Sequence, residues 1–158
     1  MKARHILLIA GLCMSSFCCF GQQQLFDRFA GQDGVSSVHI SKAMFDLLPS
    51  LGNVDNVGNV NLSHLKKIDG INILSTEKAD VKEEMRKTFK TLITDKHEEL
   101  MRIRDSQEDI TFHIRKNKNG TDIEELIMLI SGANEFTVIQ ILGHFSLKDI
   151  QDIAVRSD

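Results

Sequence analysis

Residues 109–143 read DITFHIRKNKNGTDIEELIMLISGANEFTVIQILG, and this stretch decides the fold. In Ile110–Arg115 apolar and polar side chains alternate, which is the period of a β-strand. Asn119-Gly120 favours a hairpin with a type I′ turn, because both residue types tolerate positive φ angles. Ile123–Ser131 and Phe136–Leu142 are then predicted as two further strands. Both are largely apolar on their two faces, which is typical of strands inside a sheet.

The rest of the chain predicts two more strands before this stretch, one strand leading into it, and four helices. The strands are Val35–Ser41, Ile71–Ser75 and Glu99–Arg104, and the helices are Gln22–Ala30, one capped by Ser41, Glu77–Thr94 capped by Thr76, and one capped by Ser146. This order predicts a single α+β domain with a largely antiparallel sheet of about six strands. Its C-terminal part is a four-strand meander, and the helices pack on one face.

Composition limits the classes of function. The chain has 158 residues, 42% hydrophobic, which is enough for one domain with a core. The formal net charge of -3 gives no reason to expect nucleic-acid binding. Trp and Tyr are absent, so the usual stacking platforms for sugars and bases are missing.

The N-terminus has the pattern of a secretory signal peptide. Lys2 and Arg4 precede an apolar run over residues 6–20, which is shorter than the roughly 20 residues of a membrane-spanning helix. Cleavage between Gly21 and Gln22 would separate a signal peptide, residues 1–21, from a mature domain, residues 22–158. No transmembrane span would remain, and the location would be periplasmic or secreted.

A lipoprotein is the alternative to a cleaved, anchor-free protein. Cys18 or Cys19 would then be the lipidated first residue. The sequence fits this pattern less well, because a lipobox has a small residue before the cysteine and Phe17 precedes Cys18.

The search for catalytic or metal-binding motifs finds none that is specific. Ser63-His64-Leu65-Lys66 matches Ser-x-x-Lys, but the companion motifs of penicillin-binding enzymes are absent. No two histidines have the spacing of a metal pair, although His39 and His113 could meet across the sheet. Glu124 and Glu125 point to opposite faces of their strand and are interpreted as a solvated strand end. We therefore expect no catalytic residues, no metal and no cofactor.

A basic strip is the candidate binding surface. Arg102, Arg104, His113 and Arg115 recur at every second position of two neighbouring predicted strands. We expect them on the open face of the sheet, where they could bind an acidic partner or simply form its wet side.

The chain resembles a known family, DUF4252. The resemblance lies in Leu25–Phe29, Val38–Phe45, Ile73–Thr76 and Ile139–Gly143 leading into Asp149-Ile150. It implies a small protein exported by Gram-negative bacteria, with an unknown activity. Genes of this family are sometimes found near sigma-factor and anti-sigma-factor genes. For this chain, the resemblance therefore implies a link to envelope signalling.

Two functions are open at this point. The first is a non-enzymatic protein of the cell envelope that binds an unknown envelope protein or a small ligand. The alternative is a small hydrolase, with a site assembled from scattered residues such as Ser63, Lys66 and one of the histidines.

Overall fold

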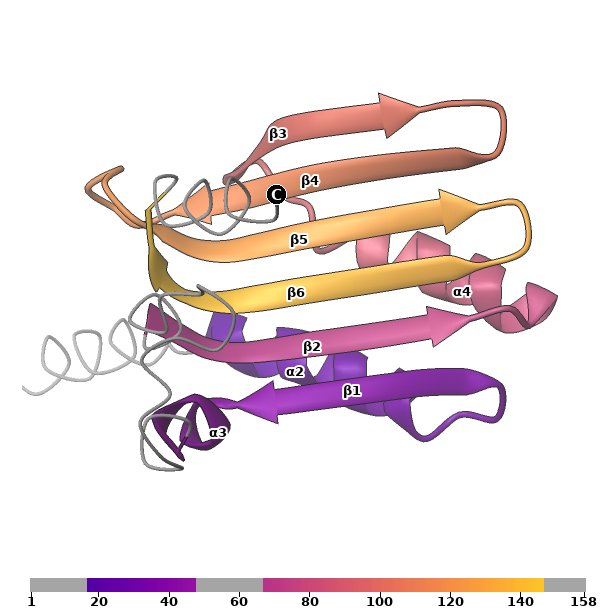
Figure 1. Cartoon of the computed structure of the whole chain (residues 1–158), viewed down its shortest axis with the longest axis horizontal. Coiled ribbons are helices and arrows are strands. Elements are labelled where there is room, and N and C mark those ends of the chain that lie inside the picture. Colours follow the sequence, from indigo (N-terminus) through magenta and orange to yellow (C-terminus); the bar gives the residue numbers. More distant parts are fainter. Residues whose placement is uncertain (1–16, 48–66, 147–158) are drawn as a thin grey trace, which may run out of the picture.

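The computed structural model describes residues 17–47 and 67–146, in which six strands form one antiparallel sheet (Figure 1). The strand order is β1-β2-β6-β5-β4-β3. The elements are α2 (Phe17–Ala30), β1 (Val35–Ser41), α3 (Lys42–Leu47), β2 (Ile68–Thr76), α4 (Ala79–Lys90), β3 (His97–Arg104), β4 (Glu108–Lys116), β5 (Ile123–Gly132) and β6 (Phe136–Phe145). The predicted α+β fold with an antiparallel sheet is confirmed.

The C-terminal meander has the predicted connectivity, because β3, β4, β5 and β6 pair in succession. The antiparallel β1–β2 pair joins the meander through the pairing of β2 with β6, where Leu74 lies opposite Val138. The two strands that are apolar on both faces, β5 and β6, therefore lie inside the sheet, as their sequence predicts.

The β4–β5 connection differs from the predicted two-residue turn. Six residues, 117–122, separate the paired residues Lys116 and Ile123. The Asn117 side chain organises them, since its Oδ1 accepts hydrogen bonds from the backbone N–H groups of Thr121 (3.0 Å) and Asp122 (3.4 Å). Gly120 adopts a φ of 72° within this loop. A side chain that bonds to nearby backbone offers the chain an alternative to the tight turn.

The core lies between one face of the sheet and the helices α2 and α4. Phe89 of α4 joins the two helices, because its ring lies 4.9 Å from that of Phe26 and 5.5 Å from that of Phe29, centroid to centroid. Below the helices, the sheet contributes buried side chains from β2, β5 and β6: Leu74, Ile127, Leu129, Phe136 and Val138. Apolar burial on this one face orients the whole sheet.

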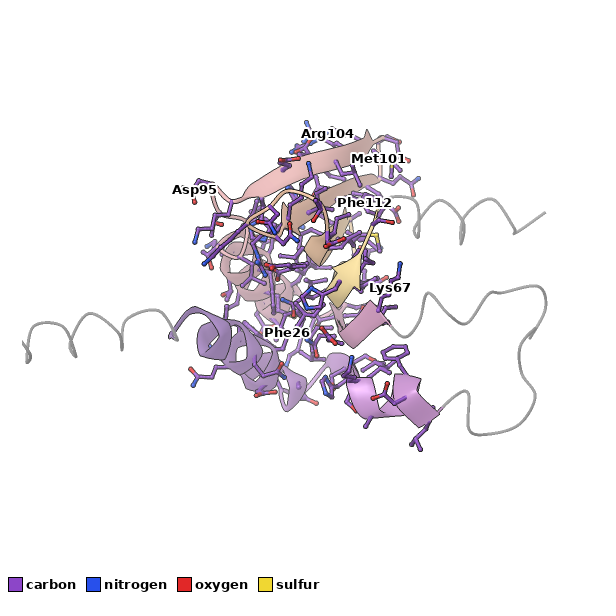
Figure 2. The ribbon with its side chains drawn as sticks, turned by 90° about the vertical axis from the view of Figure 1, so that its left-hand side faces the viewer. Phe26, Lys67, Asp95, Met101, Arg104 and Phe112 are labelled. Atoms are coloured by element: carbon purple, nitrogen blue, oxygen red, sulfur yellow. The ribbon has the colours of Figure 1, made fainter. Side chains whose placement is uncertain are left out.

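The helices cover the face that carries Thr111, His113 and Arg115, so the expected open face is the covered one. The opposite face carries an apolar row that crosses all six strands: Val38, Ile73, Ile139, Met128, Phe112 and Met101. Figure 2 shows the sheet edge-on, with Phe26 among the helices and Met101 and Phe112 on the other side. The alternation in β4 could not decide between the faces, because β5 and β6 are apolar on both.

The helix boundaries show two further differences. Helix α4 covers Ala79–Lys90 rather than the predicted Glu77–Thr94, and its N-cap is Lys78, without a side-chain cap. Thr76, the predicted cap, instead ends β2, where its hydroxyl donates a hydrogen bond to the Gly34 carbonyl at 2.7 Å. In the described residues no helix has the length and apolar character needed to cross a membrane.

Several predicted features lie outside the described residues. They are residues 1–16 of the signal peptide, the Ser63–Lys66 motif with His64, and the helix predicted after Ser146. The predicted cleavage position, between residues 21 and 22, falls within α2.

Candidate binding cleft

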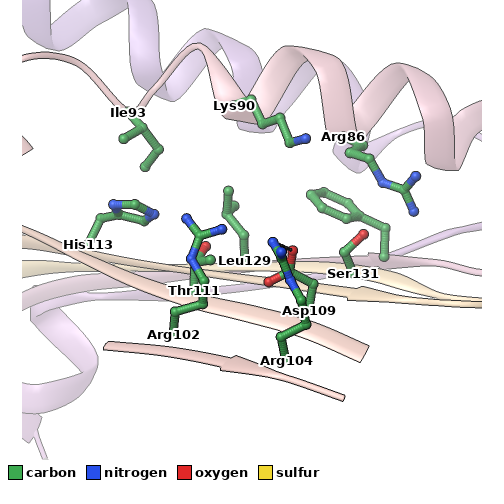
Figure 3. A pocket seen from close by; sticks show the side chains of 11 residues that line it. Arg86, Lys90, Ile93, Arg102, Arg104, Asp109, Thr111, His113, Leu129 and Ser131 are labelled. Carbon is green, nitrogen blue, oxygen red and sulfur yellow. Dashed lines mark hydrogen bonds and ion pairs between the residues drawn. The ribbon is translucent and has the colours of Figure 1, made fainter. Parts of the chain in front are cut away.

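A cleft of about 430 Å³ lies between α4 and the edge of the sheet formed by β3 and β4. Arg86, Lys90 and Ile93 come from α4 and the turn that follows it. Facing them are side chains of the strands: Arg102, Arg104, Asp109, Thr111, His113, Leu129, Ser131 and Phe136. Figure 3 shows the helix side chains directed toward those of the strands. The cleft therefore combines basic walls with a partly apolar floor.

The structure brings three of the four predicted strip residues into this cleft. Arg102, Arg104 and His113 line it. Arg115 lies on the same face, opposite His97 in the β3–β4 pairing, but outside the cleft. The two-residue period thus correctly placed all four side chains on one face. The prediction that this is the open face is wrong, because α4 packs over the same side.

Arg102 is held by Glu99, which precedes it by three residues on β3. Its Nε and Nη2 donate hydrogen bonds of 3.1 and 2.5 Å to the two carboxylate oxygens of Glu99. This hydrogen bonding lowers the pKa of Glu99 and raises that of Arg102, so both groups are charged at neutral pH. Arginine has five N–H donors, and those not used by Glu99 remain for a ligand.

Arg104 is held by Asp109, its partner across the β3–β4 pairing. Its Nη2 donates a 2.7 Å hydrogen bond to Oδ2 of Asp109 and thereby lowers the pKa of that carboxyl group. The second oxygen of Asp109, Oδ1, is buried and has no hydrogen-bond partner. A buried acceptor of this kind is costly unless something donates to it.

The α4 side of the cleft was not predicted as part of the site. Within the described chain, Lys90 is exposed and makes no hydrogen bond or ion pair, but its charge helps to lower the pKa of Asp109. Arg86 donates from Nη1 to Glu83 at 2.9 Å, while its Nε is buried without a partner. Four cationic side chains line the cleft, and three of them pair with Glu83, Glu99 and Asp109. The remaining excess of positive charge favours an anion.

Lowering the pH from 7 to 5 is expected to destabilise the protein through His113. Burial is the main cause that holds the pKa of His113 below its ordinary value of 6.5, against the opposing influence of Glu99. The unfolded chain therefore binds the proton first as the pH falls. Stability is full above pH 6.5 and is lost as the pH falls through the folded pKa. Urea unfolding at pH 7, 6 and 5 measures this loss, which should be smaller in His113→Gln; an equal loss would contradict it.

Beside the cleft, Arg115 belongs to a buried polar network around Glu125. Its Nε donates to Oε2 of Glu125 at 3.0 Å and its Nη1 donates to Glu124 at 2.5 Å. Burial lowers the pKa of Arg115, but its hydrogen bonds to the two glutamates outweigh burial and raise it. Glu125 is fully buried, so the interpretation of Glu124 and Glu125 as a solvated strand end is wrong for Glu125.

The histidines do not form a metal centre in the described residues. His39 lies on β1 and His113 on β4, with β2, β6 and β5 between them, so they cannot meet across the sheet. Nδ1 of His39 lies 2.6 Å from Oδ1 of Asn72. Within residues 17–47 and 67–146, no three His, Cys, Asp or Glu side chains come together as a metal site.

Comparison with known proteins adds one match. The model of a family described as a domain of unknown function (DUF4252) matches residues 29–153, which include every strand of the sheet. No curated protein and no solved structure matches the chain.

Proposed function

Since the chain belongs to the DUF4252 family, whose description assigns no activity, we propose its function from the cleft: it is a non-enzymatic binding protein that holds an acidic ligand or partner. The observation that carries the proposal is the concentration of Arg86, Lys90, Arg102 and Arg104 around one cavity. Cationic side chains that lie close together repel one another, and an anion bound between them reduces this repulsion.

We further place this binding role in the cell envelope. The basic start and the apolar run over residues 6–20 support export, with Cys18 or Cys19 as the alternative lipidation sites. An exported protein with an anion-binding cleft could hold either an acidic segment of another envelope protein or a small acidic molecule. A part in envelope signalling is consistent with either.

The arrangement of the cleft supports binding rather than catalysis. Arg102 and Arg104 are each fixed by a carboxylate, and burial lowers the pKa of His113. Among the described residues, no hydroxyl or thiol group makes a hydrogen bond to the His113 side chain. Nucleophilic catalysis needs a nucleophile within hydrogen-bond reach of its base. The alternative, a hydrolase built on Ser63 and Lys66, involves residues outside the described part of the chain.

Lys90→Glu is the sharpest test of the binding role. Lys90 lines the cleft, is exposed and makes no hydrogen bond or ion pair in the described residues, so the reversal removes only its longer-range attraction to Asp109. Lys87→Glu is the matched control, because it makes the same charge change in the same last turn of α4 without lining the cleft. The penalty from the helix dipole is therefore similar in both variants.

The measurement is crosslinked co-purification from envelopes of the protein's own host, with bound proteins and small molecules identified by mass spectrometry. We expect wild type and Lys87→Glu to recover the same acidic species, and Lys90→Glu to recover about tenfold less, as for the loss of one charge-assisted contact. Equal recovery by all three proteins would contradict a role for the cleft. Recovery of nothing by the wild type would overturn the binding role and favour the hydrolase.

A further inference from the structure

Two residues that line the cleft each carry a buried hydrogen-bonding atom without a partner, and the two atoms are of opposite kinds. Nε of Arg86 is a donor without an acceptor, and Oδ1 of Asp109 is an acceptor without a donor. In the described chain these are the only two such side-chain atoms, and both belong to residues that line the same cavity. Leaving a buried polar atom unpaired is costly, so a ligand toward which both side chains turn would gain binding free energy by pairing them.

From these atoms we infer that the ligand is a carboxylate with a hydrogen-bond donor on a neighbouring atom and an apolar side group. This is the chemistry of the C-terminal residue of a peptide and of an N-acylated amino acid. The inference rests on the proposed function and narrows the class of acidic ligand.

The need for a donor follows from Asp109. Its hydrogen bond with Arg104 keeps the carboxyl group ionised, so Oδ1 can only accept. Phosphate monoanions and dianions present mainly acceptors and would meet the Asp109 charge unfavourably. A ligand amide N–H would instead donate to Oδ1 while the ligand's carboxylate meets the cations.

The carboxylate and the apolar group follow from the walls. Lys90 is unpaired among the described residues, and Arg104 uses only one N–H in its bond to Asp109, so both can donate to a carboxylate. Ile93, Leu129 and Phe136 supply the apolar part of the lining. The volume of about 430 Å³ lies in the range of small-ligand pockets, about 300–1,000 Å³.

A set of related probes separates the three features of the ligand. Isothermal titration calorimetry of the purified protein would use N-acetyl-L-phenylalanine as the full probe. Three analogues each lack one feature: 3-phenylpropionate has no N–H donor, N-acetyl-L-phenylalaninamide has no carboxylate, and N-acetylglycine has no apolar group. We expect each analogue to have a Kd at least about tenfold higher than that of N-acetyl-L-phenylalanine, which corresponds to the loss of one contact of 1.4 kcal/mol.

Asp109→Asn tests the donor directly, because an asparagine amide can offer either N–H or C=O and no longer needs a ligand donor. In this variant the preference for N-acetyl-L-phenylalanine over 3-phenylpropionate should shrink toward twofold, whereas Asp95→Asn, an exposed residue outside the cleft, should keep it. Retained binding of 3-phenylpropionate would show that the Asp109→Asn cleft is intact.

The outcomes separate this inference from the proposed function. Equal Kd values for N-acetyl-L-phenylalanine and 3-phenylpropionate would overturn the inference, while sensitivity of both to Lys90→Glu would leave the anion-binding role standing. If inorganic phosphate bound and none of the carboxylate probes did, the inference would likewise be overturned and the anion-binding role would stand. Failure of every probe, with co-purification unaffected by Lys90→Glu, would overturn both. Tighter binding of the peptide Ala-Ala-Phe than of N-acetyl-L-phenylalanine would support a peptide terminus as the source, and weaker binding a free small molecule.

Discussion

Replacing Gly143 with alanine is expected to lower the free energy of unfolding by about 3 kcal/mol, at the upper end of what overpacking costs. Gly143 lies on β6 opposite Ile68, where β2 has an irregularity between Ile68 and Gly70. A Cβ atom on Gly143 would stand 2.2 Å from the carbonyl oxygen of Lys67 and 3.0 Å from Cα of Ile68. Because both are backbone atoms, no rotamer change can relieve the overlap.

In the described sheet, β2–β6 is the one strand pairing that connects β1 and β2 to the meander, so its distortion should weaken the whole sheet. Gly31→Ala is the matched control, since a Cβ on Gly31 meets nothing within 4 Å. Urea unfolding followed by circular dichroism would measure both variants. A loss of less than about 0.5 kcal/mol in Gly143→Ala, the usual range of surface substitutions, would mean that the entry to β2 can move aside.

The strands of this fold could be predicted because their signals are local. The predicted Val35–Ser41 matches β1, and the alternation from Ile110 to Arg115 lies within β4. The covered face could not be predicted from that alternation. In Ile127–Met128 and Val138–Ile139 both faces are apolar, so only the positions of α2 and α4 decide which side is buried.

The strand side of the candidate cleft could be predicted from local sequence, whereas the helix side could not. A two-residue period on paired strands puts Arg102, Arg104 and His113 on one face, and the β3–β4 register bears this out. The contribution of Arg86 and Lys90 depends on where the polar margin of α4 lies above the sheet, which helical periodicity does not give. The β4–β5 register places Arg115 opposite Glu125. The ion pair between them could therefore have been predicted by aligning the two predicted strands as a hairpin.

Replacing Glu125 with alanine is expected to lower the free energy of unfolding by about 3–5 kcal/mol, as when one partner of a buried ion pair is removed. Its Oε1 accepts a 2.5 Å hydrogen bond from Nε2 of Gln140, and its Oε2 accepts from Arg115 and lies 3.4 Å from Nε2 of His97. The side chains of Glu125 and His97 are almost completely buried. Alanine would leave Gln140 and His97 without this acceptor where water has little access.

The loss should extend beyond the immediate partners of Glu125. Oε1 of Gln140 accepts a 3.0 Å hydrogen bond from Nδ2 of Asn72, whose own oxygen lies 2.6 Å from His39. The network therefore reaches every strand of the sheet, from His39 on β1 to His97 on β3. In a region of low dielectric constant, hydrogen bonds in such a chain polarise one another, so removing the central carboxylate weakens its neighbours as well.

Two further variants separate the charge of Glu125 from its hydrogen bonds. Glu125→Gln keeps the shape and one acceptor oxygen but loses an acceptor for Arg115 or Gln140, so it should cost about 1–3 kcal/mol. Glu124→Ala removes the partly exposed partner of Arg115 and should cost less than about 1 kcal/mol. Urea unfolding at pH 7 would rank the three variants. If Glu125→Ala cost no more than Glu124→Ala, the buried carboxylate would contribute little to stability, because the hydrogen bonds of Gln140 and His97 could be replaced without it.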